Sequence, residues 1–448
     1  MSSIFTKSSH CIILYIKLKS PHRMNKTIIL TSCKGGHLLY YYLHSHCHLV
    51  KGAARGAIYD LSRNKVYSIN KRAVELLSSC KDVPIESILT AAGHNSEQNE
   101  QEKLFFDELT NKNLGGYYFF PLENCSEEKD LASPKLDFVW LELTKQCNHQ
   151  CLHCYTSSNP QTTDNQISLQ RWLSLIGELK RNGATGLQFI GGEPLLYSHW
   201  RTLVLKAHQQ KFDFIEIFTN ATRITDDDIR FFSEHNVHIA TTIFADNAEI
   251  HDEITRSPGS FDKTVHAIKK LLSHRIPLRI ASIIMRNNED QAEPIMKFCN
   301  DLGIEALPPD VIRPTGRGKN DKLLPLHYQK PPIQPPFYVN ETEFHLAKHY
   351  NPCLAGKIAI TSEGDVLPCI FSRDYVIGNI LEQSVQDIVA SSALQKCWAL
   401  NKDKMPKCKD CEYRYACPDC KIFSSTDVTT YIAGDDCSYQ PLLGTWAK

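Results

Sequence analysis

Three cysteines follow one another closely in the chain, at Cys147, Cys151 and Cys154, with the spacing C-x3-C-x2-C. They come just after an apolar stretch, residues 138–143, which we expect to form a buried strand. Iron–sulfur clusters are bound by cysteine thiolates, normally four per cluster. Three thiolates from one short loop therefore predict a [4Fe–4S] cluster with one iron left open. The alternatives are a zinc site or three unrelated buried cysteines, but zinc sites favour C-x2-C pairs with a matching second pair.

This spacing, with the aromatic Tyr155 directly after it, resembles that of the radical S-adenosylmethionine (SAM) superfamily. The resemblance implies that the open iron binds the amino and carboxylate groups of SAM. It also implies that the reduced cluster cleaves SAM to methionine and a 5′-deoxyadenosyl radical, which takes a hydrogen atom from the substrate. We therefore expect [4Fe–4S] clusters and SAM as cofactors, and we assign no catalytic side chain beyond the cluster.

From residue 137 the sequence alternates between apolar strand-like stretches and helical patterns. The expected strands are 137–143, 186–190, 214–219, 237–243, 278–285 and 306–312. The expected helices are 168–182, 198–211, 225–235, 261–274 and 289–302. Such alternation predicts a parallel α/β sheet with right-handed crossovers. It matches the partial (β/α)6 barrel of the radical SAM family, which we place at residues 135–320.

Two of the expected strands end in further motifs of this family. Gly191, Gly192 and Glu193 follow the second strand, where the glycines allow close backbone approach and Glu193 can accept from an ammonium group. Alone, this motif would also be good turn chemistry. Thr219 and Asn220 end the third strand and resemble a segment near the SAM ribose, although an asparagine is also common in strand-ending turns.

A hydroxyl at the end of the fourth strand completes the expected cofactor site. Relatives often use serine there, and this chain has Thr242. The expected SAM-binding residues are Tyr155, Gly191, Gly192, Glu193, Thr219, Asn220 and Thr242. Two other stretches resemble the family, but we assign neither of them a role in binding the cofactor. We expect residues 251–262 to form a loop and a helix start capped by Ser260 or Asp262, and we assign no role to residues 313–318.

A second group of cysteines lies near the C-terminus, in a stretch that we delimit as residues 345–448. Its members are Cys353, Cys369, Cys408, Cys411, Cys417, Cys420 and Cys437. The order resembles the SPASM domain, which carries auxiliary clusters, although two residues rather than the usual three separate Cys417 from Cys420. The resemblance implies one auxiliary cluster on Cys353, Cys369 and Cys420, with an unidentified fourth ligand, and another on the remaining four cysteines. A structural zinc ribbon is the alternative.

Residues 50–125 have the pattern of a small separate domain. Two short strands, at 56–60 and 65–69, precede a helix over 71–79 capped by Asn70. Further helices are expected at 84–92 and 100–111, and a strand at 117–120. The pattern resembles the winged-helix element that captures leader peptides as an added strand; a plain accessory domain is the alternative. Residues 1–49 receive no assignment, and Met24 is a possible alternative start.

The balance of charged residues argues against two classes of binding partner, nucleic acids and membranes. The chain has 448 residues, with 50 basic and 50 acidic side chains, so its net charge is zero. We therefore expect neither a nucleic-acid nor a membrane partner. The chain has 17 cysteines, and the motif spacings point to metal ligation in a reducing cytoplasm rather than to disulfides.

Together these features resemble a radical SAM/SPASM peptide maturase of the grasp-with-spasm type. The implied activity is oxidative crosslinking of a ribosomally made precursor peptide. The implied partners are that peptide, a flavodoxin- or ferredoxin-like reductant and an ATP-grasp ligase.

A sulfatase-maturing enzyme is an alternative, but those relatives carry an aspartate directly after the second C-terminal cysteine, where this chain has Ile370. A non-catalytic peptide-binding partner with structural metal sites is a further alternative. The complete cysteine and Gly-Gly-Glu motifs argue against it.

Overall fold

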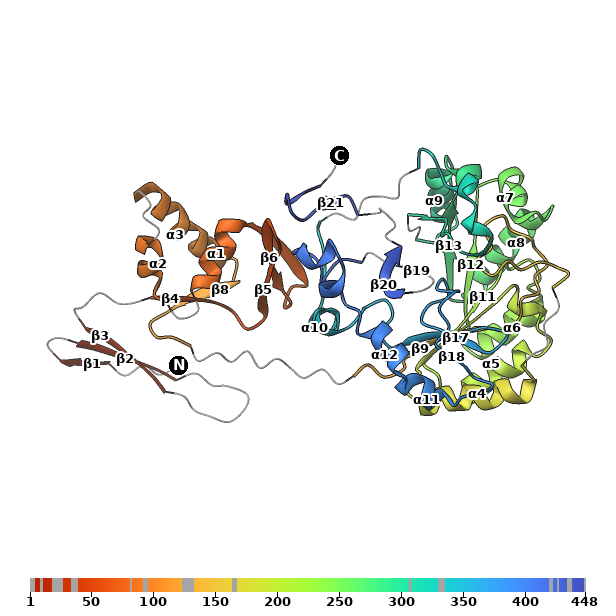
Figure 1. Ribbon diagram of the computed structural model, residues 1–448, viewed down its shortest axis with the longest axis horizontal. Coiled ribbons are helices and arrows are strands. Elements are labelled where there is room, and N and C mark those ends of the chain that lie inside the picture. Colours follow the sequence, from red (N-terminus) through yellow and green to blue (C-terminus); the bar gives the residue numbers. More distant parts are fainter. Residues whose placement is uncertain are drawn as a thin grey trace. The chain divides into compact units, whose positions relative to one another are not determined.

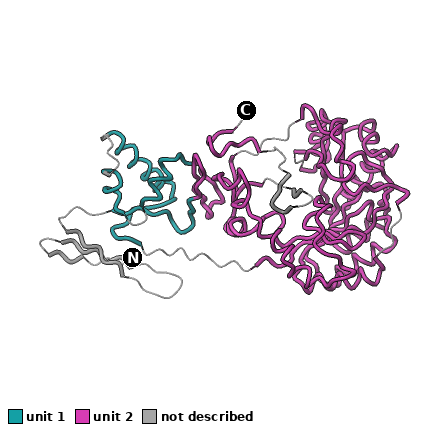
Figure 2. Tube along the Cα trace, viewed as in Figure 1, with its two compact units in different colours: residues 1–49, 69–128 teal, residues 50–68, 129–448 magenta. Residues whose placement is uncertain are grey.

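The chain divides into two compact units in a computed structural model (Figure 2). The first unit contains residues 1–49 and 69–128, and the second contains residues 50–68 and 129–448. The structure describes residues 5–8, 11–17, 27–33, 39–80, 83–91, 96–122, 133–162, 167–305, 308–328, 335–418, 422–424, 427–432 and 437–446. Cys420 and most of the expected linker before residue 135 lie outside these ranges.

The first unit contains a small helical layer and short strands. Strands β1 (Phe5–Ser8), β2 (Cys11–Lys17) and β3 (Thr27–Cys33) form one antiparallel sheet, and β4 (Tyr40–Leu43) pairs with β8 (Gly115–Tyr118). The helices are α1 (Lys71–Ser79), α2 (Ile85–Ala91) and α3 (Ser96–Asn111). The Asn70 side chain accepts a hydrogen bond from the Ala73 N–H at 2.8 Å, as the sequence predicted. A winged-helix arrangement and the limits 50–125 stay predictions.

The second unit is built on one eight-stranded sheet, visible in Figure 1. Its order is β13 (Leu278–Ala281), β12 (His238–Thr242), β11 (Phe214–Phe218), β10 (Gly186–Ile190), β9 (Phe138–Glu142), β16 (Lys357–Ile360), β17 (Asp365–Leu367), β18 (Gly378–Asn379). From β13 to β16 every neighbouring pair is parallel, and β17 and β18 continue antiparallel. The mixed α/β fold with a parallel core is therefore confirmed.

Helices cover one face of this sheet. They are α4 (Leu169–Arg181), α5 (Trp200–Gln209), α6 (Asp226–Glu234), α7 (Ala248–Thr255), α8 (Ser260–Ser273) and α9 (Ala292–Asp301). Trp172, Ile176 and Leu179 lie on one side of α4 and pack in the same core as strand residues Leu187 and Ile217. The opposite face of the strands is left to line a cavity.

The C-terminal cysteine region continues the barrel sheet. Strand β16 pairs in parallel with β9, the strand that leads to Cys147. The remaining elements are α10 (Glu341–His349), α11 (Val385–Ala390), α12 (Ser392–Trp398), β19 (Ile422–Ser424), β20 (Asp427–Ile432), β21 (Tyr439–Gln440) and β22 (Thr445–Trp446). The segment after Cys369 is thereby tied to the same sheet as the Cys147 loop.

A hairpin from the N-terminal part of the chain belongs to this second unit. Strands β5 (Cys47–Lys51), β6 (Arg55–Asp60) and β7 (Lys65–Asn70) form a three-stranded sheet. Tyr59 of β6 is fully buried, and its hydroxyl donates to the Glu412 carbonyl at 2.9 Å. The Arg414 guanidinium donates to the Lys51 carbonyl at 2.8 Å. Residues 50–68 are thus attached to the loop that carries Cys411 and Cys417.

Two sequence expectations about secondary structure are wrong. Residues 248–255 form helix α7 rather than a loop. Helix α8 begins after Gly259, so neither Ser260 nor Asp262 is its N-cap. The Asp252 carboxylate instead accepts from the N–H groups of Gly259 and Phe261, at 2.6 and 2.8 Å. A side chain from α7 therefore caps α8, which a local capping pattern does not reveal.

The end of the barrel also differs from the expectation. The strand expected at 278–285 is interrupted at Ser282, giving β13 and the short β14 (Ile283–Ile284). Within residues 308–312, the described part of the sixth expected strand, β15 (Asp310–Val311) forms and pairs with β14 in a separate sheet. In the described part of the chain, no helix is long and apolar enough to span a membrane.

Candidate functional site

The loop that carries the three barrel cysteines leaves the carboxyl end of β9 and lines a cavity of about 980 Å³. Cys147 is buried and Cys151 and Cys154 are partly buried. The Cys147 sulfur accepts from the His149 N–H at 3.4 Å, and the Cys154 sulfur accepts from the Ser158 N–H at 3.4 Å. Such N–H groups stabilise thiolates, and hydrogen bonds to sulfur tune iron–sulfur clusters.

Burial makes these thiols hard to ionise on their own. It raises the pKa of Cys147 to about 12, with the Glu193 carboxylate adding to the shift, and it raises the pKa of Cys151 well above its usual range. A bound cation would offset this cost, because metal ligation deprotonates thiols. The donor set therefore fits a metal centre.

Two segments from elsewhere in the chain fix this loop. The Gly192 N–H donates to the Thr144 carbonyl at 2.6 Å, and a Cβ at Gly192 would lie 2.2 Å from the Gln146 carbonyl oxygen. On the other side, Arg317 donates to the carbonyls of Cys151 and Ser158, each at 2.8 Å. Residues 313–318, which had no role from sequence, thus include a clamp on the cysteine loop.

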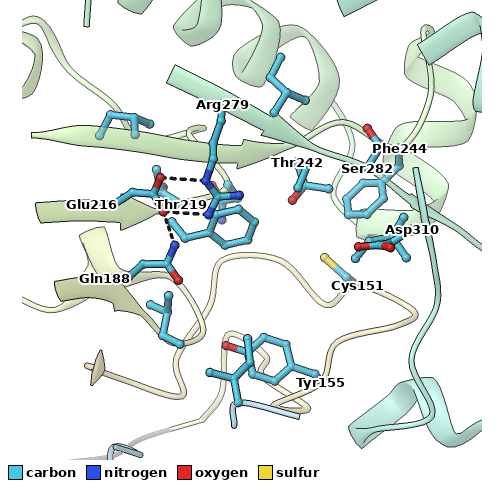
Figure 3. Close-up of a pocket in the computed structure, with 18 of the residues that line it drawn as sticks. Cys151, Tyr155, Gln188, Glu216, Thr219, Thr242, Phe244, Arg279, Ser282 and Asp310 are labelled. Atoms are coloured by element: carbon cyan, nitrogen blue, oxygen red, sulfur yellow. Dashed lines mark hydrogen bonds and ion pairs between the residues drawn. The ribbon is translucent and has the colours of Figure 1, made fainter. Parts of the chain in front are cut away.

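The cavity brings together most of the expected SAM-binding residues. Tyr155, Gly191, Gly192, Thr219, Asn220 and Thr242 line it with the three cysteines. Figure 3 shows Tyr155 below Cys151 and Thr242 above it, with Thr219 on the next strand end. Because these residues come from four different strand ends, the parallel sheet is what gathers them.

Glu193 lies outside this lining. It is fully buried, and its carboxylate accepts from the Leu195 N–H, the Thr219 hydroxyl and the Asn220 N–H at 2.9, 2.7 and 2.8 Å. Burial raises the pKa of Glu193 despite these hydrogen bonds. The structure thus places the carboxylate behind the strand ends, holding Thr219 and Asn220.

The C-terminal region contributes directly to the cavity wall. Ile370 and Phe371, just after Cys369, line the cavity. The Phe371 ring packs edge-on against Tyr155, with centroids 5.7 Å apart. Arg373 lies over Tyr155 and forms an ion pair with Glu142, which is buried at the end of β9. This contact joins the segment after Cys369 to the loop of Cys154.

Four of the auxiliary cysteines are connected by packing, a backbone hydrogen bond and electrostatic interactions. Cys411 and Cys437 pack in one cluster around Phe337, Tyr413 and Tyr439. The Cys411 sulfur accepts from the Tyr413 N–H at 3.4 Å, repeating the arrangement at Cys147. The Cys411 N–H donates to the Cys408 carbonyl at 3.0 Å. Cys417 also acts on the pKa of Cys411, which burial raises above its usual range.

The other auxiliary cysteines are Cys353, Cys369 and Cys420. Cys353 is exposed before β16, and Cys369 is partly buried after β17. Cys420 lies outside the described residues. The grouping of Cys353, Cys369 and Cys420 on one cluster therefore stays a prediction.

A polar network in the cavity was missed by sequence reasoning. Arg279 on β13 donates to both carboxylate oxygens of Glu216 on β11, each at 2.8 Å, and Gln188 on β10 also donates to Glu216 (Figure 3). Charged residues within strands that are otherwise apolar were the available signal. Glu216 in Phe-Ile-Glu-Ile-Phe alternates to the inner face, where only a partner makes its burial tolerable.

Comparisons with known proteins agree with this site. The family model of the radical SAM superfamily matches residues 141–299, and that of the SPASM iron–sulfur cluster-binding domain matches residues 353–412. The chain is 27% identical over 57% of its length to the antilisterial bacteriocin subtilosin biosynthesis protein AlbA of Bacillus subtilis (strain 168), and it spans 60% of that protein. It is 25% identical over 69% of its length to an AdoMet-dependent heme synthase of Methanosarcina barkeri (strain Fusaro / DSM 804), covering 97% of that protein.

A solved structure shares the fold. Streptococcus suis SuiB bound to S-adenosylmethionine aligns with a TM-score of 0.52 and 15% identity, over 84% of this chain and 94% of SuiB. SuiB bound to its precursor peptide SuiA aligns with a TM-score of 0.50 and 14% identity over the same shares.

Proposed function

We propose that this radical SAM enzyme with a SPASM domain modifies a ribosomally made precursor peptide by removing two hydrogens in an oxidative crosslink. The observation that carries the proposal is the shared cavity of the Cys147 loop, the strand ends and Ile370–Phe371. Ligand pockets usually measure about 300–1,000 Å³. At about 980 Å³, this cavity has room for a nucleoside cofactor together with part of a substrate.

The residues of the chain divide the work in this proposal. Cys147, Cys151 and Cys154 would hold the SAM-binding cluster, and the strand ends with Gly191, Gly192, Thr219, Asn220 and Thr242 would hold SAM. The chemistry supplied at such a centre is one-electron reductive cleavage of SAM to methionine and a 5′-deoxyadenosyl radical, which removes one hydrogen atom from the substrate. The second hydrogen would leave as a proton and an electron when the new bond closes, and an auxiliary cluster would accept that electron. Tyr155, Phe371 and the apolar strand faces exclude water from the cavity, which protects reactive species.

The hairpin at residues 50–68 supports a peptide as the substrate. Its strand β7 is an edge strand of the three-stranded sheet and has three exposed residues, and a strand edge is the usual place for peptide capture by strand addition. We propose that the leader of the precursor binds the N-terminal part of the chain in this way. We also propose a flavodoxin- or ferredoxin-like reductant and an ATP-grasp ligase acting on the same peptide.

A heme-forming reaction is the second candidate, because the M. barkeri heme synthase aligns over almost its whole length. That alignment covers only 69% of this chain, so a heme-forming reaction leaves the rest of the chain without a role. A peptide-binding region would give those residues a role. The sulfatase-maturing alternative is disfavoured because Ile370, rather than an acid, follows Cys369 in the cavity wall.

The test is the intact mass of the short peptide encoded beside this gene, co-expressed with the enzyme. We expect a loss of two hydrogens, and no loss with Cys147→Ala, which lacks one thiol of the loop. Fragmentation then locates the new bond. An unchanged peptide mass with an active, cluster-loaded enzyme would reject oxidative crosslinking of that peptide.

A further inference from the structure

The inner wall of the barrel carries an ion pair with unused hydrogen-bond donors. The two bonds from Arg279 to Glu216 use two of the five N–H donors of a guanidinium. The Glu216 side chain is 4% exposed, whereas that of Arg279 is 54% exposed and lies in the lining of the cavity. Arg279 is also stacked 5.4 Å from the centroid of the Phe218 ring. A fixed guanidinium edge therefore faces the space that a substrate would occupy.

The charge around this edge is balanced. Glu216 neutralises Arg279, and Gln188 adds a hydrogen bond to the same carboxylate. The lining also contains Arg313, Glu305 and Asp310, and Arg313 lies over the Phe371 ring, 5.1 Å from its centroid. With two arginines and three carboxylates in the lining, the wall carries no net positive charge. A substrate carboxylate would gain little attraction here, because Glu216 already neutralises Arg279 and would repel a second carboxylate.

The surface beside the ion pair is aromatic. Phe138 packs edge-on against Trp140 at 5.0 Å, and Phe214 lies 6.2 Å from Phe138. All three rings line the cavity and come from β9 and β11. Such a wall suits an apolar or aromatic side chain placed next to a hydrogen-bonding backbone.

We propose that Arg279, held by Glu216, binds a neutral carbonyl of the substrate, namely a backbone carbonyl of an extended peptide beside an apolar or aromatic residue, and disfavours carboxylates. This inference rests on the proposed function and narrows its substrate class.

Two defined probes test the inference without a reactive precursor. N-acetyl-phenylalanine N-methylamide presents a neutral carbonyl, and N-acetyl-phenylalanine presents a carboxylate. Their binding to the full, cluster- and SAM-loaded chain is measured by saturation-transfer NMR. We expect the wild type to bind the amide about tenfold better, the effect of one hydrogen bond together with charge repulsion.

Two variants distinguish the effect of the Arg279 charge from that of the planar shape of its guanidinium group. Glu216→Gln leaves Arg279 uncompensated, so the preference should reverse toward the carboxylate. Arg279→Lys keeps the charge but loses the planar fork, so the amide should bind several-fold more weakly. Arg230→Lys is the matched control, because Arg230 pairs with Asp227 on the exposed face of α6, and it should behave as the wild type does.

Three results would overturn the inference: no binding of either probe to the wild type, an unchanged preference in Glu216→Gln, or unchanged amide binding in Arg279→Lys. Each would leave the mass test of the precursor peptide unaffected. Conversely, an unmodified precursor together with the expected probe selectivity would reject the proposed reaction and keep the binding site.

Discussion

The Arg317 guanidinium donates from Nε to the carbonyl of Cys151 at 2.8 Å, so an arginine far along the chain holds the middle cysteine of the loop. A second nitrogen of the same group donates to the Ser158 carbonyl. The backbone at residue 316 approaches closely as well, because a Cβ at Gly316 would lie 2.3 Å from the Tyr155 carbonyl oxygen. The conformation of the cysteine loop thus depends on a segment beyond the barrel strands.

The variant Arg317→Lys tests this clamp. An ammonium group cannot span two carbonyls as a planar fork does, so the loop should hold its cluster less firmly. We expect iron bound per chain after reconstitution, followed by a chelator challenge, to fall by half or more relative to the wild type. Arg286→Lys, whose side chain bonds the exposed Leu324 carbonyl, is the control. Equal iron retention in both variants would contradict the clamp.

The variant Glu193→Gln tests whether the buried carboxylate acts through its neighbours. An amide nitrogen would face a donor, most directly the Asn220 N–H, so one buried hydrogen bond is lost at a cost of about 1–3 kcal/mol. We expect SAM to bind roughly tenfold more weakly, measured by calorimetry on the cluster-loaded chain. Glu178→Gln on the surface of α4 is the control. SAM affinity that matches the wild type would mean that Thr219 and Asn220 do not need this anchor.

The variant Tyr59→Phe tests the link between the hairpin and the auxiliary cysteine loop. It removes the hydroxyl that satisfies the Glu412 carbonyl, which we expect to destabilise this region by about 1–3 kcal/mol. Because Glu412 lies between Cys411 and Cys417, chelators should remove the auxiliary iron faster. The exposed Tyr338, which is 63% accessible, provides the control Tyr338→Phe. The link is refuted if iron leaves both variants at the wild-type rate.

The variant Asp252→Asn tests whether the charge of Asp252 makes the stability of the fold depend on pH. Burial tends to raise the pKa of Asp252, but hydrogen bonds from the Ser260 hydroxyl and the N–H groups of Phe261 and Gly259 outweigh it and lower the pKa. A lowered folded-state pKa contributes stability above the unfolded value, near pH 4, which is lost as the pH falls through the folded value.

At pH 7 we therefore expect the free energy of unfolding of the wild type to exceed that of Asp252→Asn by about 0.5–2 kcal/mol, the usual contribution of a helix cap. The wild type should accordingly unfold at a higher temperature. The difference in stability between the wild type and the variant should shrink as the pH falls below 4. Thermal melts at pH 7 and pH 3.5 measure it. A gap that is constant between the two pH values would show that the charge of Asp252 does not carry the effect.

The sequence predicted the parts of the site that follow one another closely. The cysteine loop, the Gly-Gly-Glu segment and the strand ends at Thr219 and Thr242 are local patterns at the ends of apolar strands, and a parallel sheet necessarily gathers such ends. The strands β9 to β12 appear within one or two residues of the expected ranges for the same reason.

The missed features depend on partners distant in sequence. The hydrogen bonds that the Glu193 carboxylate accepts from Thr219 and Asn220, just after the next strand, could not be read from the local motif, and its expected contact with SAM stays a prediction. Asp252 belongs to α7 but caps the next helix, α8. The Arg279–Glu216 pair and the Arg317 clamp join residues more than 60 positions apart. Local periodicity carries no information about such pairs.

The central claim is that a peptide supplies the hydrogen atom removed in the cavity. The most direct measurement uses the precursor peptide encoded beside the gene, with its core residues fully deuterated, and follows the isotope into 5′-deoxyadenosine by mass spectrometry. The account predicts 5′-deoxyadenosine that carries one deuterium and forms faster when the peptide is present. Unlabelled 5′-deoxyadenosine, formed at the same rate with and without the peptide, would contradict it.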